Sequence, residues 1–139
     1  MAFKEDNIMG TWGITTFEND DALDWLHDLA QSSDIRLLKE ALEVDEEIES
    51  WDASVALAAS EVIAGLSGSS RGELPENAQK WINDNKNLDI GNLPAKASNV
   101  IDLILNDDSE LFRLWKESED FEAWKNNVLA LQHVLRNIS

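Results

Sequence analysis

The segment from Ala53 to about Leu66 constrains the fold most, because it is apolar nearly all the way round a helix. A surface helix carries one apolar stripe, whereas a helix without a polar face needs neighbours on several sides. Its alanines would let those neighbours approach closely. The apolar residues of this segment are Val55, Ala56, Leu57, Ala58, Ala59, Val62, Ile63, Ala64 and Leu66. We therefore predict a central, buried helix here, capped at its start by Asp52.

Helical periodicity continues through most of the remaining chain, and no period-two pattern persists for long. The last apolar stripe, for example, consists of Phe121, Trp124, Val128, Leu131, Leu135 and Ile138. The predicted further helices cover residues 20–31, 34 to 48 or 49, 75–84 and 94–106, followed by a short helix capped by Asp107 that runs through residue 115 or 116, and a final segment capped by Ser118. We predict an all-α fold, a compact single-domain bundle of six to seven helices around the central apolar helix.

Several residues mark the expected helix starts. Asn19 is a favourable N-cap, and Asp20 and Asp21 would then lie in the first turn, where the helix dipole favours negative charge. Ser33 is a possible cap for the second helix, and Pro75 suits the first position of a later one. The expected starts after these are Pro94 and, on capping-box spacing, Asp107 with Glu110.

The N-terminal segment is more specified than a helix start requires. Gly10 and Gly13 flank Trp12, and glycine permits tight turns or close backbone approach. Trp12 and Phe17 are large apolar anchors. We predict a tight N-terminal loop that these two side chains pin against the helices.

This segment also carries a family resemblance, together with a second segment near the C-terminus. The matching strings are Gly10-Thr11-Trp12-Gly13, Phe17-Glu18-Asn19-Asp20-Asp21-Ala22 and Asp24-Trp25-Leu26, followed later by residues 109–118 with Phe121 and Trp124. They resemble the bacterial family named domain of unknown function 4259. The resemblance covers the chain from Met9 onward, and it implies a small, soluble, bacterial helical protein without assigned catalytic residues. It divides the chain into an N-terminal extension, residues 1–8, and a single helical domain, residues 9–139.

Composition excludes several chemistries. The 139 residues contain no cysteine, which removes disulfides, thiolate metal sites and cysteine catalysis. The N-terminus lacks the apolar run of a secretory signal, and no segment approaches the roughly 20 apolar residues of a membrane span. We expect a cytoplasmic protein that does not bind a membrane.

Charge is the strongest functional indication. The net charge is −17, and residues 1–61 hold sixteen acids against three bases, whereas the remainder holds twelve against eight. Such an excess disfavours direct nucleic-acid binding, which needs Lys and Arg to neutralise phosphates, and it favours a basic protein partner. The expected partner-binding residues are Glu43, Asp45, Glu46, Glu47, Glu49 and Trp51. Trp51 has two interpretations, an exposed anchor for a partner or a side chain that folds back to staple the central helix.

Glu61 is unexpected because it lies within the most apolar helix. If buried, it needs a partner such as an Arg, a Lys or backbone amides of the N-terminal loop. It then either fastens that loop to the core or acts as a general acid or base in a cleft; otherwise it faces solvent. The possible loop–core polar site consists of Trp12, Asn19, Asp20, Asp21 and Glu61. A cleft joining Glu61 to the Asn19–Asp21 turn would favour a hydrolytic or metal-dependent enzyme.

Metal ligands and cofactor motifs are not expected. Asp20, Asp24 and Asp28 recur every four residues, but on a helix they span about 12 Å, too far for one ion. His27 and His133 do not form a zinc-binding pattern. We therefore expect a solvated face, no metal and no cofactor. Three functions stay open: a non-enzymatic binding module for a basic partner, the enzyme centred on Glu61, and a helical protein that associates only with itself.

Overall fold

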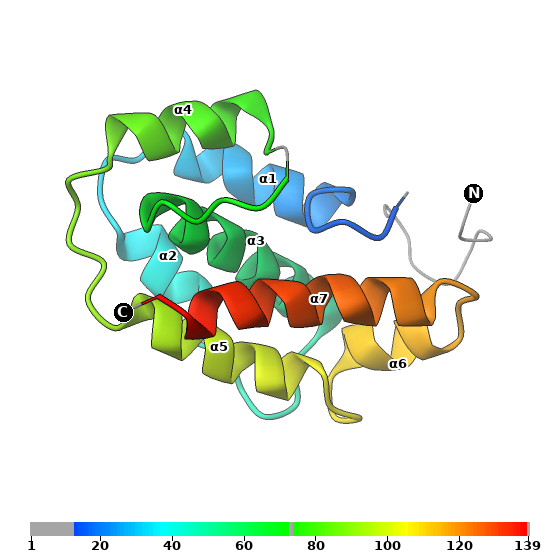
Figure 1. Cartoon of the computed structure of the whole chain (residues 1–139). Coiled ribbons are helices and arrows are strands. Elements are labelled where there is room, and N and C mark those ends of the chain that lie inside the picture. Colours follow the sequence, from blue (N-terminus) through cyan, green and yellow to red (C-terminus); the bar gives the residue numbers. More distant parts are fainter. Residues whose placement is uncertain (1–12, 73, 139) are drawn as a thin grey trace.

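The structure, a computed structural model, describes residues 13–72 and 74–138. Within these residues it contains seven α-helices and no strand, which confirms the all-α prediction (Figure 1). The helices are α1 (Asp20–Leu29), α2 (Arg36–Ala41), α3 (Ser50–Leu66), α4 (Glu76–Asp84), α5 (Leu93–Ile104), α6 (Glu110–Lys116) and α7 (Phe121–Arg136). The predicted extension and the Gly10 and Trp12 part of the N-terminal loop lie outside the described residues.

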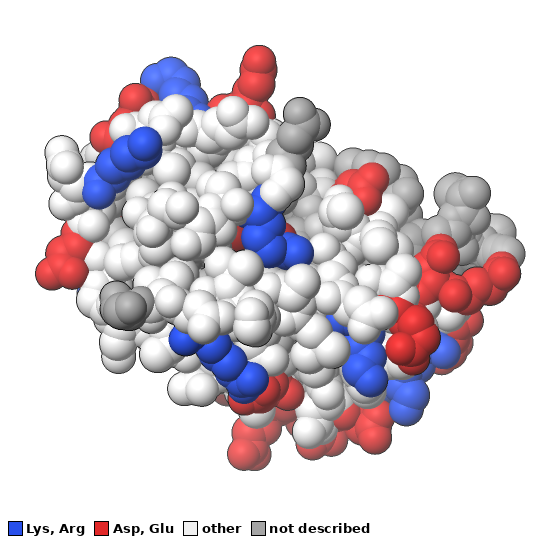
Figure 2. Space-filling view, viewed as in Figure 1, with Lys and Arg blue, Asp and Glu red and all other residues white. Residues whose placement is uncertain are grey.

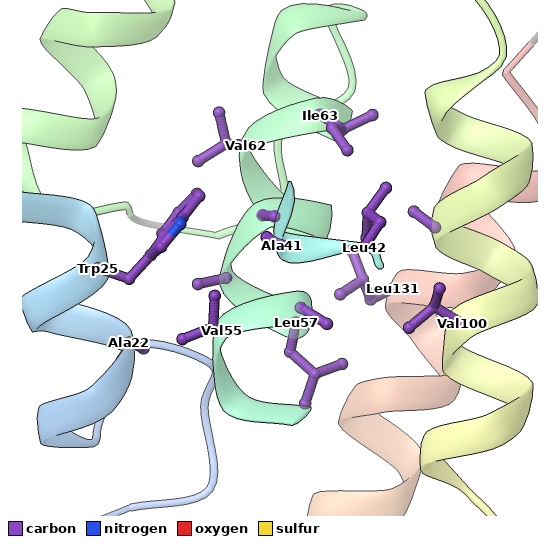
Figure 3. Packing of buried hydrophobic residues seen from close by; sticks show 14 of the residues in the cluster. Ala22, Trp25, Ala41, Leu42, Val55, Leu57, Val62, Ile63, Val100 and Leu131 are labelled. Carbon is purple, nitrogen blue, oxygen red and sulfur yellow. The ribbon is translucent and has the colours of Figure 1, made fainter. Parts of the chain in front are cut away.

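Helix α3 lies among the other six helices and contacts each of them. Every residue from Ala53 to Gly65 is buried. On one side, Trp25 of α1 points toward α3 beside Val55 and Val62, and Leu131 of α7 lies on the opposite side (Figure 3). Burying an aliphatic side chain contributes about 1.5–3 kcal/mol, so the residues packed around α3 together contribute strongly to the stability of the fold.

The start of α1 agrees with the sequence prediction. Asn19 is its N-cap, and the Asn19 Oδ1 accepts a hydrogen bond from the Ala22 N–H at 2.8 Å. Asp20 and Asp21 occupy the first turn. The cap therefore satisfies an N–H that the helix itself leaves free.

The second predicted helix is too long, because α2 ends at Ala41 and residues 42–49 form a loop. Glu43, Glu46 and Glu47 would repel one another at helical spacing. Tertiary contacts also fix the end of this loop against the start of α6. Ile48 is buried, and its carbonyl accepts a hydrogen bond from the Glu110 N–H at 2.8 Å. The predicted acidic helix face is therefore an acidic loop.

Four predicted caps differ from those observed, and the N-cap of α2 is Ile35 instead of Ser33. Helix α3 begins at Ser50 instead of after Asp52, and its Ser50 N–H donates to Oε1 of Glu110 at 2.7 Å. Helix α6 is capped by Ser109, not by Asp107. Ser118 precedes the N-cap of α7, which is Asp120. In α3 the capping group lies 60 residues away in sequence, so local spacing could not identify it.

Four of the tryptophans are buried in the core, as the apolar stripes predicted: Trp25, Trp81, Trp115 and Trp124. The rings of Trp115 and Trp124 stack with centroids 5.4 Å apart. Trp81 donates its indole N–H to the Ser32 carbonyl at 2.9 Å, which links α4 to the end of α1. These side chains therefore join helices that are distant in sequence.

No helix among residues 13–72 and 74–138 combines the length and the apolar character needed to cross a bilayer.

Candidate functional site

Glu61 is buried in the middle of α3, and both of its carboxylate oxygens accept hydrogen bonds. Its Oε2 accepts from the Thr16 hydroxyl at 2.7 Å and from Nη2 of Arg71 at 2.6 Å. Its Oε1 accepts from Nε of Arg71 at 3.4 Å. The side chains of Glu61 and Arg71 are only 5% and 19% exposed, so the pair is largely withdrawn from water. The solvent-facing interpretation of Glu61 is therefore wrong.

The Glu61–Arg71 pair holds together three parts of the chain. Arg71 also donates from Nη1 to Oδ1 of Asn127 in α7 at 3.3 Å. Asn127 in turn donates from Nδ2 to the Ile14 carbonyl at 3.4 Å. Together with the Thr16 hydrogen bond, these contacts attach residues 13–19 to α3 and α7. The arrangement agrees with a carboxylate that fastens the N-terminal segment to the core.

A cleft of about 300 Å³ opens beside this network. We call it the polar cleft, and it is lined by Thr15, Thr16, Phe17, Glu61, Arg71, Gly72, Leu74 and Asn127. Asn19 is not in its lining but donates from Nδ2 to the Thr16 carbonyl at 3.0 Å. Asp20 and Asp21 are also outside the lining. The structure thus brings Glu61 to the segment before the Asn19–Asp21 turn, not to the turn itself, and Trp12 lies outside the described residues.

The carboxylate of Glu61 already has close partners within the polar cleft. A buried carboxylate is stable when an opposite charge and hydrogen bonds compensate it, and Glu61 already accepts from Arg71 and Thr16. Sequence reasoning missed Arg71, Thr16 and Asn127. A signal for one of them existed, because Arg71 is the sole Lys or Arg between Lys39 and Lys80 in the sequence.

A second cleft, of about 270 Å³, lies between α1, α2 and α3. We call it the acidic groove, and it is lined by Asp24, Trp25, Asp28, Leu37, Glu40, Ala41, Glu43, Trp51, Asp52 and Val55. Five of these residues carry a carboxylate, and none of the described lining residues is a Lys or an Arg. The other five are apolar or aromatic. The groove therefore combines an apolar surface with an excess of negative charge.

Only part of the predicted partner-binding set lines the acidic groove. Glu43 and Trp51 do. The remaining members are exposed in the loop between α2 and α3 and continue the acidic surface away from the groove: Asp45, Glu46, Glu47 and Glu49. All three carboxylates of the acidic ladder of α1 are exposed, in agreement with the predicted solvated face, and two of them, Asp24 and Asp28, also line the groove.

Trp51 is a surface residue. Its side chain does not fold back into the core, so the staple interpretation is wrong: it remains 55% exposed, in the first turn of α3. Trp25, which also lines the groove, is buried. Since large aromatic side chains favour burial, the exposed indole at the acidic groove is a candidate contact residue.

The acidic ladder of α1 affects the neighbouring carboxyl group of Asp21. Partial burial, and then the neighbouring carboxylates of Asp24 and Asp20, raise the pKa of Asp21 above its ordinary value of 3.8. Partial burial and repulsion from Asp24 and Asp20 therefore both disfavour the ionised form of Asp21 in the folded protein.

The charged groups on the face drawn in Figure 2 are arranged differently. Figure 2 shows a face on which acidic and basic side chains both occur, with acidic groups gathering at the right-hand end, where α6 meets α7 in Figure 1. Ion pairs join Lys80 to Asp84 and Lys116 to Asp107. Along the acidic groove, Glu40 pairs with Arg36 at 3.5 Å, but both side chains are more than half exposed. Such an exposed pair contributes little.

No group of three or more His, Asp or Glu side chains among the described residues is placed to hold a metal ion. His27 and His133 are both exposed, and their ring nitrogens lie close to the amides of Gln31 and Asn137. The carboxylates of the acidic groove therefore border a cleft without converging on one point.

The protein is therefore a small all-α protein in which the carboxylate of the polar cleft is paired with Arg71, while the acidic groove is lined by five carboxylates. Residues 10–127 match the model of the family described as "Domain of unknown function (DUF4259)", and the chain belongs to this family. Comparison with curated proteins and with solved structures gave no significant match. The family description assigns no activity.

Proposed function

We propose that this protein is a non-enzymatic binding module that docks a basic protein partner on the surface formed by α1, α2 and the loop before α3. The observation that carries the proposal is the acidic groove, in which Trp51 is exposed among five carboxylates. Immunity proteins and mimics of nucleic acid are the kinds of protein that use such a surface, the first to neutralise a toxin and the second to mask a nucleic-acid-binding site.

The surrounding charge supports the same partner chemistry. Ten acidic residues between α1 and α3 are exposed: Asp20, Asp24, Asp28, Asp34, Glu40, Glu43, Asp45, Glu46, Glu47 and Glu49. In that part of the sequence only Arg36 and Lys39 are basic. A surface of one sign can raise the association rate of an oppositely charged partner by about 10- to 10³-fold at low salt. The surface would also repel nucleic acid and other anionic partners.

The test is capture from the host cell with matched charge variants. We expect wild-type protein to retain one or more basic proteins that elute as NaCl rises, because salt screens the attraction. The Glu46→Lys/Glu47→Lys variant should lose them. The control is Glu117→Lys/Glu119→Lys, which makes the same charge change on exposed residues near the start of α7 and should retain them. Retention that is indifferent both to salt and to reversal at Glu46 and Glu47 would refute the proposal.

A second candidate, a hydrolytic or metal-dependent enzyme centred on Glu61, is favoured by one observation, the polar cleft beside that residue. We rank it second because Glu61 already pairs with Arg71. A panel of ester, amide and phosphoester substrates, assayed with and without Mg²⁺ and Ca²⁺, tests it. Turnover that disappears in Glu61→Gln, while the variant keeps its helical circular dichroism, would reverse the ranking.

A further inference from the structure

The acidic groove offers a ligand an apolar surface in addition to negative charge. Leu37 and Ala41 of α2, and Val55 of α3, lie in the same lining as the carboxylates. Trp51 is exposed beside them, on the first turn of α3. A ligand in this groove would meet hydrocarbon and an indole ring as well as negative charge.

The size of the groove limits its occupant. Its volume of about 270 Å³ is at or below the lower end of ordinary small-molecule pockets, which is about 300 Å³. It is therefore suited to one long side chain of a partner, not to a whole helix or a large cofactor.

An arginine side chain satisfies all three features of the groove. Its methylene stem can cover the apolar lining while its charged end stays at the surface. Its planar guanidinium can stack on an indole and can donate to several carboxylates at once. The compact, strongly hydrated ammonium of lysine neither stacks nor forks in this way.

Resting on the proposed function, we propose that the acidic groove is an anchor pocket for one arginine side chain of the basic partner, held between Trp51 and the carboxylates of Asp24 and Asp28. Arg36 is the nearby competitor, but its contact with Glu40 is long and solvent-exposed, so an incoming guanidinium displaces little.

The test uses N-acetyl-arginine-methylamide as the probe and does not need the partner. Added to the isotope-labelled full chain at low salt, it should shift the indole N–H resonance of Trp51 and saturate in the millimolar range. The citrulline analogue has nearly the same shape but no charge, and the lysine analogue has the charge but no planar group. We expect no saturable shift from citrulline and weaker binding by lysine. Equal binding of the arginine and citrulline probes would overturn the proposal.

Matched variants separate the pocket from general attraction. Asp24→Asn/Asp28→Asn and Glu46→Gln/Glu47→Gln remove the same charge, but only the first pair lines the groove. The first should weaken arginine binding by about three- to tenfold, the effect expected of two exposed ion pairs. The second should change it far less. Equal weakening by both variants would show diffuse attraction and no pocket.

Trp51→Ala tests the stacking contact, followed through the amide resonance of Val55. It should weaken the arginine probe by about two- to fivefold, the scale of an exposed cation–π contact. The variant should keep its unfolding midpoint, because Trp51 is exposed. If a basic protein is captured in a salt-dependent way but the arginine probe binds no better than the citrulline and lysine probes, the anchor pocket is refuted and the docking function is not. Arginine binding without any captured partner would refute the docking function alone.

Discussion

The polar cleft and the acidic groove are similar in volume, but a guanidinium lies against the carboxylate of the polar cleft, whereas no Lys or Arg is among the described lining of the acidic groove. In the polar cleft, the one buried carboxylate, Glu61, lies against a guanidinium and a hydroxyl. In the acidic groove, five carboxylates lie together without a basic side chain in the described lining. The comparison shows where negative charge has to be compensated within the fold. A charge withdrawn from water needs a fixed partner, whereas an exposed charge is stabilised by water and stays available to another molecule.

The largest expected effect is loss of the compensating charge in the polar cleft. Arg71→Met should destabilise the protein by about 3–5 kcal/mol, because it leaves Glu61 buried and unpaired. Urea unfolding at neutral pH measures this. The control is Arg36→Met, which breaks the exposed pair with Glu40 and should cost less than about 1 kcal/mol.

A double variant decides whether compensation is the cause. Glu61→Met/Arg71→Met removes both charges and should recover most of the stability lost in Arg71→Met. If the double variant is as unstable as the single one, Arg71 stabilises the fold by packing and not by neutralising Glu61.

The next effect concerns the hydroxyl on the same carboxylate. Thr16→Val keeps the shape of the side chain but removes the 2.7 Å hydrogen bond to Glu61, and should cost about 1.5–3 kcal/mol because the acceptor is charged. Urea unfolding again measures it. Thr15→Val is the matched control, since the Thr15 hydroxyl makes an exposed hydrogen bond to Glu18, whose side chain is only partly buried. Equal losses in the two variants would contradict the assigned burial.

A third prediction tests how the acidic groove is supported. Glu110→Ala removes the carboxylate that caps α3 at Ser50, next to Trp51. We expect a loss of about 1 kcal/mol, the usual value of an N-cap. The indole N–H resonance of Trp51 should also shift. Glu117→Ala, an exposed position after α6, is the control and should change neither quantity.

The response of the melting temperature to salt should report the repulsion between the exposed carboxylates of the acidic groove. Raising NaCl screens the repulsion between exposed carboxylates, so the melting temperature of the wild-type protein should rise. The rise should be smaller in Asp24→Asn/Asp28→Asn, which lacks two of the five carboxylates in the groove. A melting temperature that falls with NaCl in the wild-type protein would mean that attractive pairs dominate its surface.

The smallest expected effect is on the pH dependence of stability. The folded state raises the pKa of Asp21 above 3.8, so the ionised side chain is less favourable folded than unfolded. This penalty is present above the folded pKa and disappears as pH falls below 3.8. The melting temperature of Asp21→Asn should therefore be slightly higher than that of the wild type at pH 7. Below about pH 3 the two melting temperatures should be equal, as measured by thermal unfolding. A lower melting temperature of the variant at pH 7 would show that the helix-dipole contribution of Asp21 exceeds the repulsion.

Local patterns were sufficient for most of the fold. The apolar stripes identified the helices and the four core tryptophans, and the Asn19 cap was identified by its residue type and position. These features depend on neighbours within a turn or two. Where the contact was distant, as between Glu110 and Ser50, sequence reasoning placed the start of α3 at the wrong cap.

The sequence by itself determined an all-α fold, an excess of acid in the first half and an isolated glutamate in an apolar helix. Periodicity and composition are properties of the chain, so they can be read without coordinates. Only the tertiary structure decided that Arg71 and Thr16 meet Glu61, and that the ladder of α1 borders the same groove as Trp51. Those pairings depend on how helices distant in sequence are packed, and packing is settled by the whole core at once.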